Sequence, residues 1–119
     1  MDLELKKAFV DLQHKVVGTN QKLQLKDQHI EQMIRMKKEN ETTSKEFTKL
    51  SLDTVVYESV GRSFILTDLE HVKENLIKEN RSIDEKIATL VKDKEFLTRS
   101  MKQSEENLRE LIQQKKNQT

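Results

Sequence analysis

The sequence has no cysteine, no proline and no tryptophan, and it has only two glycines among 119 residues. Without cysteine, these residues can form neither a disulfide bond nor a thiolate zinc site. Without proline, and with so little glycine, the chain lacks the residues that most often end helices, so long helices are expected. Hydrophobic residues make up 34% and aromatic residues 4% of the chain, which is too little for a sizeable globular core.

Charged residues make up 36% of the chain, but acids and bases are interspersed and the net charge is only +1. Such a chain has no strong field that would attract nucleic acid or an anionic membrane, so we expect neither as a partner. No apolar run is long enough to span a bilayer. The acidic start, MDLE, does not fit a secretory signal, so we expect a cytoplasmic protein.

A first long helix is predicted over residues 3–38, with Asp2 as its N-cap. Its apolar residues recur at alternating steps of three and four, which is typical of a coiled-coil seam. Polar residues at 39–42 interrupt the pattern, so we expect the helix to end there. The seam consists of Phe9, Leu12, Val16, Thr19, Leu23, Lys26, Ile30 and Met33, with Leu5 one step earlier.

A short helix is predicted next, over residues 43–52, because Thr43 and Glu46 have the spacing of a capping box. Phe47 and Leu50 share one face of this helix. We expect both side chains to pack on the first turns of the last helix.

The last helix is predicted over residues 68–116, where Thr67 and Glu70 form a second capping box. Two interleaved rows of residues, each with a spacing of seven, run along about six heptads of it. One row is Leu69, Leu76, Ile83, Leu90, Leu97, Ser104 and Leu111; the other is Lys73, Asn80, Ile87, Lys94, Met101 and Leu108.

The two long helices are expected to fold back on each other. Pairing Phe9 with Leu108 sets apolar residues opposite one another along most of the seam and brings both chain ends to one tip. In this register Lys26 faces Leu90 near the middle of the coil. The predicted fold is mainly α, an antiparallel two-helix coiled coil that forms a single domain over residues 1–119.

Residues 54–67 do not fit a helix, and we expect them to form a β-hairpin at the base of the coil. β-Branched and aromatic residues stand on both sides of Gly61, which is predicted to need an unusual backbone angle at the turn. An isolated hairpin is marginal in water, so strands of other chains are expected to complete a shared sheet or inter-subunit β-barrel. The residues expected to carry this assembly are Val55, Val56, Tyr57, Val60, Gly61, Phe64, Ile65 and Leu66.

Apolar residues near both chain ends form a second candidate surface. Helix ends fray and have few neighbours, so the tip is expected to offer a partly exposed apolar groove to unfolded polypeptides. The alternative is that these residues only widen the core of the coil. They are Leu3, Leu5, Phe9, Val10, Leu108, Leu111 and Ile112.

Three stretches of the sequence resemble a β-class prefoldin subunit: LELKKAF at 3–9, IEQ at 30–32 and YESVGRSFIL at 57–66. The single hairpin suits the β class. The resemblance implies a hexameric co-chaperone of two α-class and four β-class subunits, whose hairpins build a double β-barrel. It also implies that unfolded actin and tubulin bind at the coil tips without ATP and pass to the cytosolic chaperonin.

No catalytic residue, cofactor or metal site is predicted. His14, His29 and His71 have neither the spacing nor the carboxylate neighbours of a metal site. No glycine-rich loop is present to bind phosphate. Two other protein classes share the heptads. A structural coiled-coil scaffold would have no reason to contain an apolar hairpin, and a basic-region DNA binder would need an arginine-rich helix that this sequence lacks.

Overall fold

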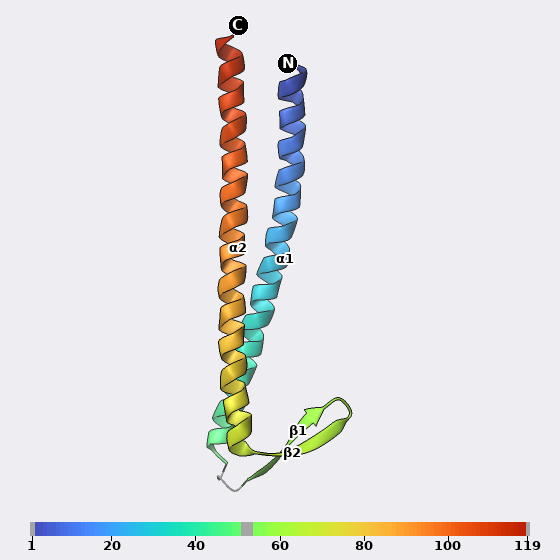
Figure 1. Cartoon of the computed structure of the whole chain (residues 1–119), viewed down its shortest axis with the longest axis vertical. Coiled ribbons are helices and arrows are strands. Elements are labelled where there is room, and N and C mark those ends of the chain that lie inside the picture. The colour runs from blue at the N-terminus through green and yellow to red at the C-terminus, as the bar shows by residue number, and fades with distance from the viewer. Residues whose placement is uncertain (1, 51–53, 119) are drawn as a thin grey trace. The chain divides into compact units, whose positions relative to one another are not determined.

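The computed structural model of the protein describes residues 2–50 and 54–118, and it consists of two long helices and one hairpin (Figure 1). This confirms the predicted mainly α fold with a single two-stranded antiparallel hairpin. In chain order the elements are α1 (Leu3–Thr48), β1 (Val55–Val60), β2 (Ser63–Asp68) and α2 (Leu69–Asn117).

The chain divides into two compact units, each of which contains a part of both helices. Unit 1 comprises Met1–His29 and Thr89–Thr119, and unit 2 comprises Ile30–Ala88. The hairpin therefore belongs to unit 2, and the two chain ends belong to unit 1.

The N-terminus of α1 is capped by Asp2, as predicted. Its Oδ1 accepts a hydrogen bond from the backbone N–H of Leu5 at 2.7 Å. Its backbone carbonyl accepts the N–H of Lys6 at 3.1 Å, which closes the first helical turn.

The polar stretch at 39–42 does not interrupt α1, so the prediction of separate helices over 3–38 and 43–52 is wrong. Thr43 caps no helix; its hydroxyl donates instead to the carbonyl of Glu39, one turn earlier, at 2.9 Å. The stretch contains neither proline nor glycine, so it weakens packing without removing a backbone hydrogen bond. Leu52, the expected end of the short helix, and Asp53, just before the expected hairpin, lie outside the described residues.

The N-cap of α2 is Asp68, one residue later than the predicted capping box at Thr67. Asp68 Oδ1 accepts the backbone N–H of His71 at 2.7 Å. Thr67 and Asp68 both pair in the sheet, opposite Val56 and Val55, and α2 begins at Leu69, directly after Asp68. The point at which β2 ends and α2 begins thus decides which of two suitable capping residues is used.

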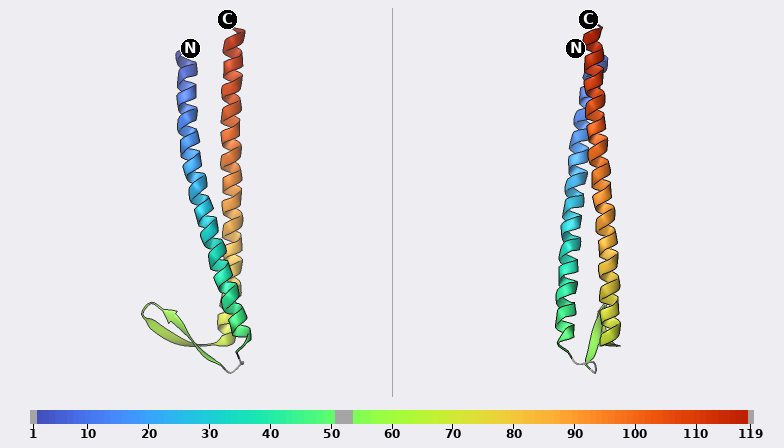
Figure 2. Two further views of the ribbon diagram at one scale, coloured as in Figure 1. Left: turned by 180° about the vertical axis from the view of Figure 1, so that it is seen from behind. Right: turned by 90° about the vertical axis from the view of Figure 1, so that its left-hand side faces the viewer.

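In unit 1, polar contacts show that α1 and α2 lie side by side and antiparallel (Figure 2). The amine of Lys15 donates to the hydroxyl of Ser100 at 3.0 Å. Further along, Lys26 lies 3.4 Å from the carboxylate of Asp93. Lys94 of α2 binds Asp27 of α1 in return.

In unit 2 the helices are also antiparallel. The side-chain amide of Asn40 donates to the amide oxygen of Asn80 at 2.9 Å. Lys37 binds Asp84 at 2.8 Å nearby. Because asparagine side chains are short, the first of these bonds places positions 40 and 80 directly opposite each other.

The predicted register is therefore wrong by three residues, since it placed Asn40 opposite Ile77. With Asn40 opposite Asn80, the steps of three and four along one seam coincide with those along the other. The predicted register instead sets steps of three against steps of four. In unit 1 the pairs around Lys26 and Lys94 agree with the corrected alignment, because each lysine reaches the acid beside the other.

The buried residues form a narrow seam. Among the described residues, the apolar side chains with the least exposed surface are Met33, Leu69, Ile83 and Leu108, between 2% and 8% exposed. All four belong to the predicted seam rows. The core is thus a line of contacts along the helices.

A two-residue turn joins β1 and β2. Val60 pairs with Ser63, which leaves Gly61 and Arg62 as the turn. Gly61 has φ +60°, and no other residue in the described part of the chain has a positive φ. A glycine at the first central position is typical of a type II′ turn, and the predicted role of Gly61 is confirmed.

The two glycines are expected to respond oppositely to alanine. Gly61→Ala forces a Cβ into the left-handed region and should cost about 1–2 kcal/mol, so hydrogen-exchange protection of β1 and β2 should fall roughly 5- to 30-fold. Gly18→Ala should raise the unfolding free energy by up to about 1 kcal/mol, because the added Cβ meets nothing within 4 Å. Unchanged strand protection in Gly61→Ala would contradict the turn assignment.

Candidate functional site

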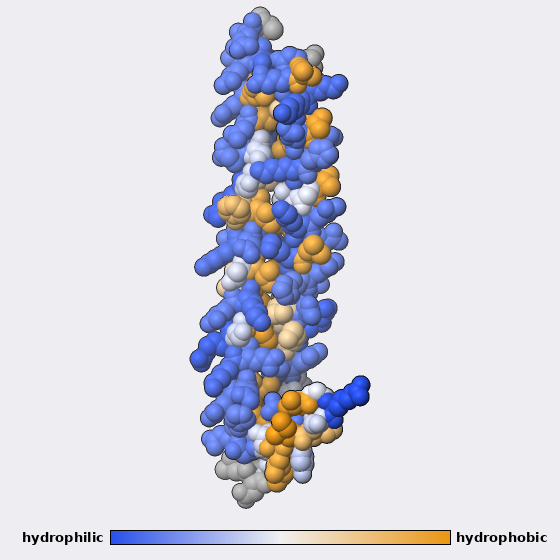
Figure 3. Space-filling model, turned by 45° about the vertical axis from the view of Figure 1, so that its right-hand side comes forward, coloured by the Kyte–Doolittle hydropathy of each residue, from blue (hydrophilic) through white to orange (hydrophobic). Residues whose placement is uncertain are grey.

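One side of the hairpin carries four large apolar side chains that face solvent. The register sets Tyr57 opposite Leu66, and directly opposite residues in an antiparallel pair lie on the same face. Val55 is 62% exposed, Tyr57 66%, Phe64 73% and Leu66 63%. The space-filling view shows this apolar surface on the hairpin (Figure 3). We call these four residues the hairpin face.

The opposite side of the hairpin is partly covered within unit 2. Val56 is half-buried, whereas Val60 and Ile65 remain about half exposed. A groove of about 380 Å³ beside the hairpin is lined by Val55, Val56 and Tyr57 of β1 together with Phe47, Val72 and Leu76 of the helices, so it also reaches two residues of the hairpin face. Phe47 therefore lies near the first turns of α2, where it was expected to pack.

Leu50, the other residue expected to pack there, is 41% exposed. It lies just beyond the end of α1 at Thr48, where its backbone N–H bonds the carbonyl of Phe47 at 3.1 Å. The helix ends too early to turn Leu50 onto the same face as Phe47.

The strand edges are as open as the hairpin face. The sheet described here has only two strands, β1 and β2, so each strand has one edge without a neighbouring strand among the described residues. Backbone donors and acceptors along such an edge are a template for pairing with another chain.

The structure brings all eight predicted hairpin residues into the two strands and their turn. Alternation along each strand puts Val55 and Tyr57 on one face of β1, and Phe64 and Leu66 on one face of β2. It could not show that both pairs lie on the same face. That depends on the register, which the turn at Gly61 sets.

The predicted tip residues gather near the chain ends in unit 1, but their exposure differs. Leu3 is 83% exposed, Val10 43% and Phe9 40%. Leu108 is only 8% exposed, so it belongs to the seam. The remaining three, Leu5, Leu111 and Ile112, are half-buried.

A groove of about 300 Å³ runs between the helices in unit 1. Its apolar lining consists of Ala8, Leu12, Leu108 and Leu111, and its polar lining includes Asp11, Ser104 and Asn107. Lys15 lines the groove and is held by Ser104 Oγ at 2.5 Å. Leu12 and Lys15 were not predicted as tip residues; Leu12 is a seam residue one helical turn from the small Ala8, which could have identified it, whereas no such signal marks Lys15.

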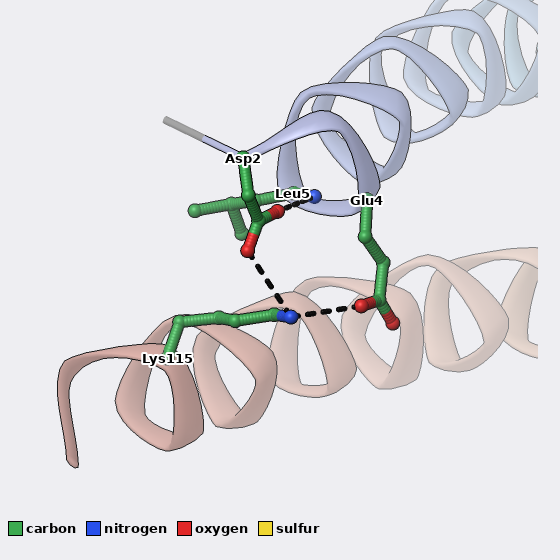
Figure 4. A network of polar contacts seen from close by, with 4 residues as sticks. All are labelled: Asp2, Glu4, Leu5 and Lys115. Carbon is green, nitrogen blue, oxygen red and sulfur yellow. Dashed lines mark hydrogen bonds and ion pairs between the residues drawn. The ribbon is translucent and has the colours of Figure 1, made fainter. Parts of the chain in front are cut away.

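An ion-pair cluster joins the two ends of the chain (Figure 4). The amine of Lys115 lies 3.1 Å from Asp2 and 2.8 Å from Glu4. The same Asp2 caps α1 through Leu5. The first turn of α1 and the last turns of α2 therefore meet, as predicted for the tip.

These contacts shift two pKa values in opposite directions. The backbone N–H of Leu5 and then the Lys115 amine lower the pKa of Asp2 below its usual 3.8. Hydrogen bonds to Glu4 and then Asp2 raise the pKa of Lys115 above its usual 10.5. Both groups are therefore charged over the whole physiological range of pH.

Within residues 2–50 and 54–118, no group of three or more histidine, aspartate or glutamate side chains is placed to hold a metal ion. In the same part of the chain, neither helix contains a stretch apolar enough to cross a membrane.

Comparison with known proteins agrees with the fold. Residues 11–115 match the family model described as prefoldin subunit, which is most of the chain. The protein belongs to the prefoldin subunit family. Prefoldin subunits are chaperones and not enzymes, and membership implies assembly with other prefoldin subunits.

Individual prefoldins match over nearly the whole chain. Prefoldin subunit 1 of Bos taurus and that of Homo sapiens are each 45% identical over 112 residues, covering 94% of this chain and 92% of theirs. A probable prefoldin subunit 1 of Caenorhabditis elegans is 34% identical, covering 97% of this chain and 98% of its own. The crystal structure of the prefoldin beta subunit from Thermococcus strain KS-1 has the same fold. It aligns with a TM-score of 0.73 at 18% identity, covering 92% of this chain and 93% of that one.

The cluster around Lys115 should respond to salt and extremes of pH. Because the pKa of Asp2 is lowered, its carboxylate stabilises the paired ends above about pH 4, and this stabilisation is lost as the pH falls further. Because the pKa of Lys115 is raised, its amine stabilises the paired ends below about pH 10, and this stabilisation is lost at higher pH. Protection factors of the Leu5 and Lys6 amides should therefore be constant between these limits and fall with added salt.

Lys115→Gln should lower the same protection factors at neutral pH by about twofold to fivefold, as expected for an exposed ion pair. Lys92→Gln removes the same charge from another part of α2 and serves as the matched control. Equal protection in both variants would show that the cluster does not hold the chain ends.

Proposed function

We propose that this chain is a β-class subunit of a cytoplasmic prefoldin hexamer with two α-class and four β-class subunits. In this proposal the hairpin joins an inter-subunit β-barrel. The tip residues bind unfolded polypeptides, including actin and tubulin, without ATP, and the complex passes them to the cytosolic chaperonin. The exposed hairpin face is the observation that carries the proposal.

The energetics of the hairpin face favour several partners over one. Burying Val55, Tyr57, Phe64 and Leu66 contributes on the order of 6–12 kcal/mol. Association costs about 4–15 kcal/mol in lost freedom, so contact between two such faces alone is marginal. Strand pairing at the open edges adds hydrogen bonds, and a closed ring of hairpins leaves no edge exposed. This supports a shared barrel rather than a simple pair.

The exposed apolar residues near the chain ends support the second part of the proposal. Leu3, Phe9 and Val10 are at least 40% exposed and lie in the same unit as the groove over Leu108. A partly open apolar surface on helices that end nearby can adapt to many unfolded sequences. Widening of the intramolecular core does not account for Leu3, which is 83% exposed.

Assembly is tested with Phe64→Ser and Leu66→Ser together. Loss of two large apolar residues from the hairpin face should prevent incorporation into a hexamer when the chain is mixed with α-class and β-class prefoldin subunits. The control is Leu25→Ser with Phe96→Ser, because these helix residues are 65% and 64% exposed, like the two hairpin residues. Native mass spectrometry should find hexamers with the control only. A homodimer of the unmodified chain would instead support a coiled-coil scaffold.

Client binding is tested with Leu3→Ser and Ile112→Ser together. This variant should form hexamers but capture chemically denatured actin at least about fivefold less well, because both side chains would lose burial against the client. Capture is measured as suppression of aggregation at equal hexamer concentration, with Leu25→Ser and Phe96→Ser again as control. Undiminished capture would remove the tip from the proposal.

A further inference from the structure

A second apolar row runs along α1 in unit 1, outside the seam. Leu3, Val10 and Val17 are 83%, 43% and 58% exposed, and they recur every seven residues. Residues with this spacing form one stripe along a helix, about 21 Å long here. The space-filling view shows apolar side chains at intervals along α1 (Figure 3). The intramolecular coil leaves this stripe uncovered.

A basic row lies on the same side of unit 1. The ion pair of Asp27 with Lys94 identifies that side, because it joins the helices across the seam there. On α1, the residues that share the heptad position of Asp27 form a row, and this row lies between the seam and the apolar row. On α2, the row nearest the seam holds Thr98, Glu105 and Ile112, and the row beyond it holds Lys102, Arg109 and Lys116, which are all exposed.

The charges on this side are mainly positive near the chain ends. Lys6 stands between Leu3 and Val10 on α1 and adds to the three bases of α2. Glu105 is an acid among them. We call the apolar row and the basic row together the basic-apolar flank, which consists of Leu3, Val10, Val17, Lys102, Arg109 and Lys116.

The spacing of the apolar row selects the conformation of an occupant. Successive residues of the row are about 10.5 Å apart, which matches positions i and i+7 of another helix. Same-face residues of an extended strand recur at about 6.6 Å and would not match the row. The basic row requires that the side of the occupant next to α2 be acidic, because opposite charges across an interface set orientation.

We propose that the basic-apolar flank binds an acidic amphipathic helix of another protein, about 15–18 residues long. The apolar stripe of that helix packs on Leu3, Val10 and Val17, and its acidic side faces Lys102, Arg109 and Lys116. The inference rests on the proposed function, because the bound helix is taken to be a segment of a captured client protein. It extends that function by naming the class of segment that this surface binds.

The test uses a prefoldin hexamer assembled with this chain and a labelled peptide of about 18 residues, with leucines at heptad spacing and glutamates on both flanks. Fluorescence anisotropy should show binding that weakens several-fold as salt is raised. A scrambled peptide of the same composition, and a peptide with lysine in place of glutamate, should bind at least about tenfold more weakly.

Two variants separate the halves of the flank. Val10→Ser with Val17→Ser, and separately Lys102→Glu with Arg109→Glu, should each weaken binding of the acidic peptide by about tenfold or more. The control for the apolar pair is Leu25→Ser, since Leu25 is 65% exposed and lies outside the flank. The control for the basic pair is Lys22→Glu with Lys86→Glu. Both controls should bind like the unmodified chain.

Equal binding of the acidic, scrambled and lysine peptides would overturn the inference. Binding of anionic phospholipid vesicles that depends on the same residues would also overturn it, because the flank would then be a membrane surface. Capture of denatured actin by the same hexamers distinguishes the two proposals. If the hexamers capture denatured actin but do not bind the acidic peptide, only the helix site is refuted. If they bind the peptide, and the variant Leu3→Ser with Ile112→Ser captures denatured actin undiminished, only the client-binding tip is refuted.

Discussion

A two-stranded hairpin cannot pair all of its own backbone groups or bury both of its faces, and this constraint governs unit 2. Each strand of the hairpin has an open edge in the described part of the chain, and the four side chains of the hairpin face are more than 60% exposed. The turn at Gly61 sets one register of β1 against β2, and this register places all four side chains of the hairpin face on one side. The apolar surface is thus built into the backbone geometry, and in our proposal other prefoldin subunits cover it.

The helices depend on a different constraint, since their core is only a seam. Apolar contacts along such a seam repeat with every heptad, so they specify a register weakly. The register is decided instead by polar contacts that can form in only one alignment of the helices. In unit 2 the amides of Asn40 and Asn80 meet only in one alignment, and in unit 1 Lys26 and Lys94 each reach the acid beside the other lysine.

The exposed surfaces divide by chemistry. The hairpin face is wholly apolar and suits a permanent interface, which is commonly more hydrophobic than a transient one. The basic-apolar flank mixes exposed apolar and charged rows, which suits a partner that binds and leaves. Lys115, by pairing with Asp2 and Glu4, holds the chain ends together beside that flank.

Much of this protein followed from local sequence signals. Composition, the absence of proline and the heptads predicted two long helices; the β-branched residues around Gly61 predicted the hairpin; and Asp2 predicted the first cap. These features depend on backbone propensity and periodicity, which neighbouring residues set.

Tertiary structure decided what local signals leave open. α1 continues through residues 39–42 because a polar stretch without proline or glycine does not break a helix. The N-cap is Asp68 and not Thr67 because β2 extends to Asp68 and α2 begins only at Leu69. The steps of three and four along the two seams exclude the predicted register but fit every register that differs from the true one by a whole heptad, so the polar side chains that meet across the seam identify the alignment.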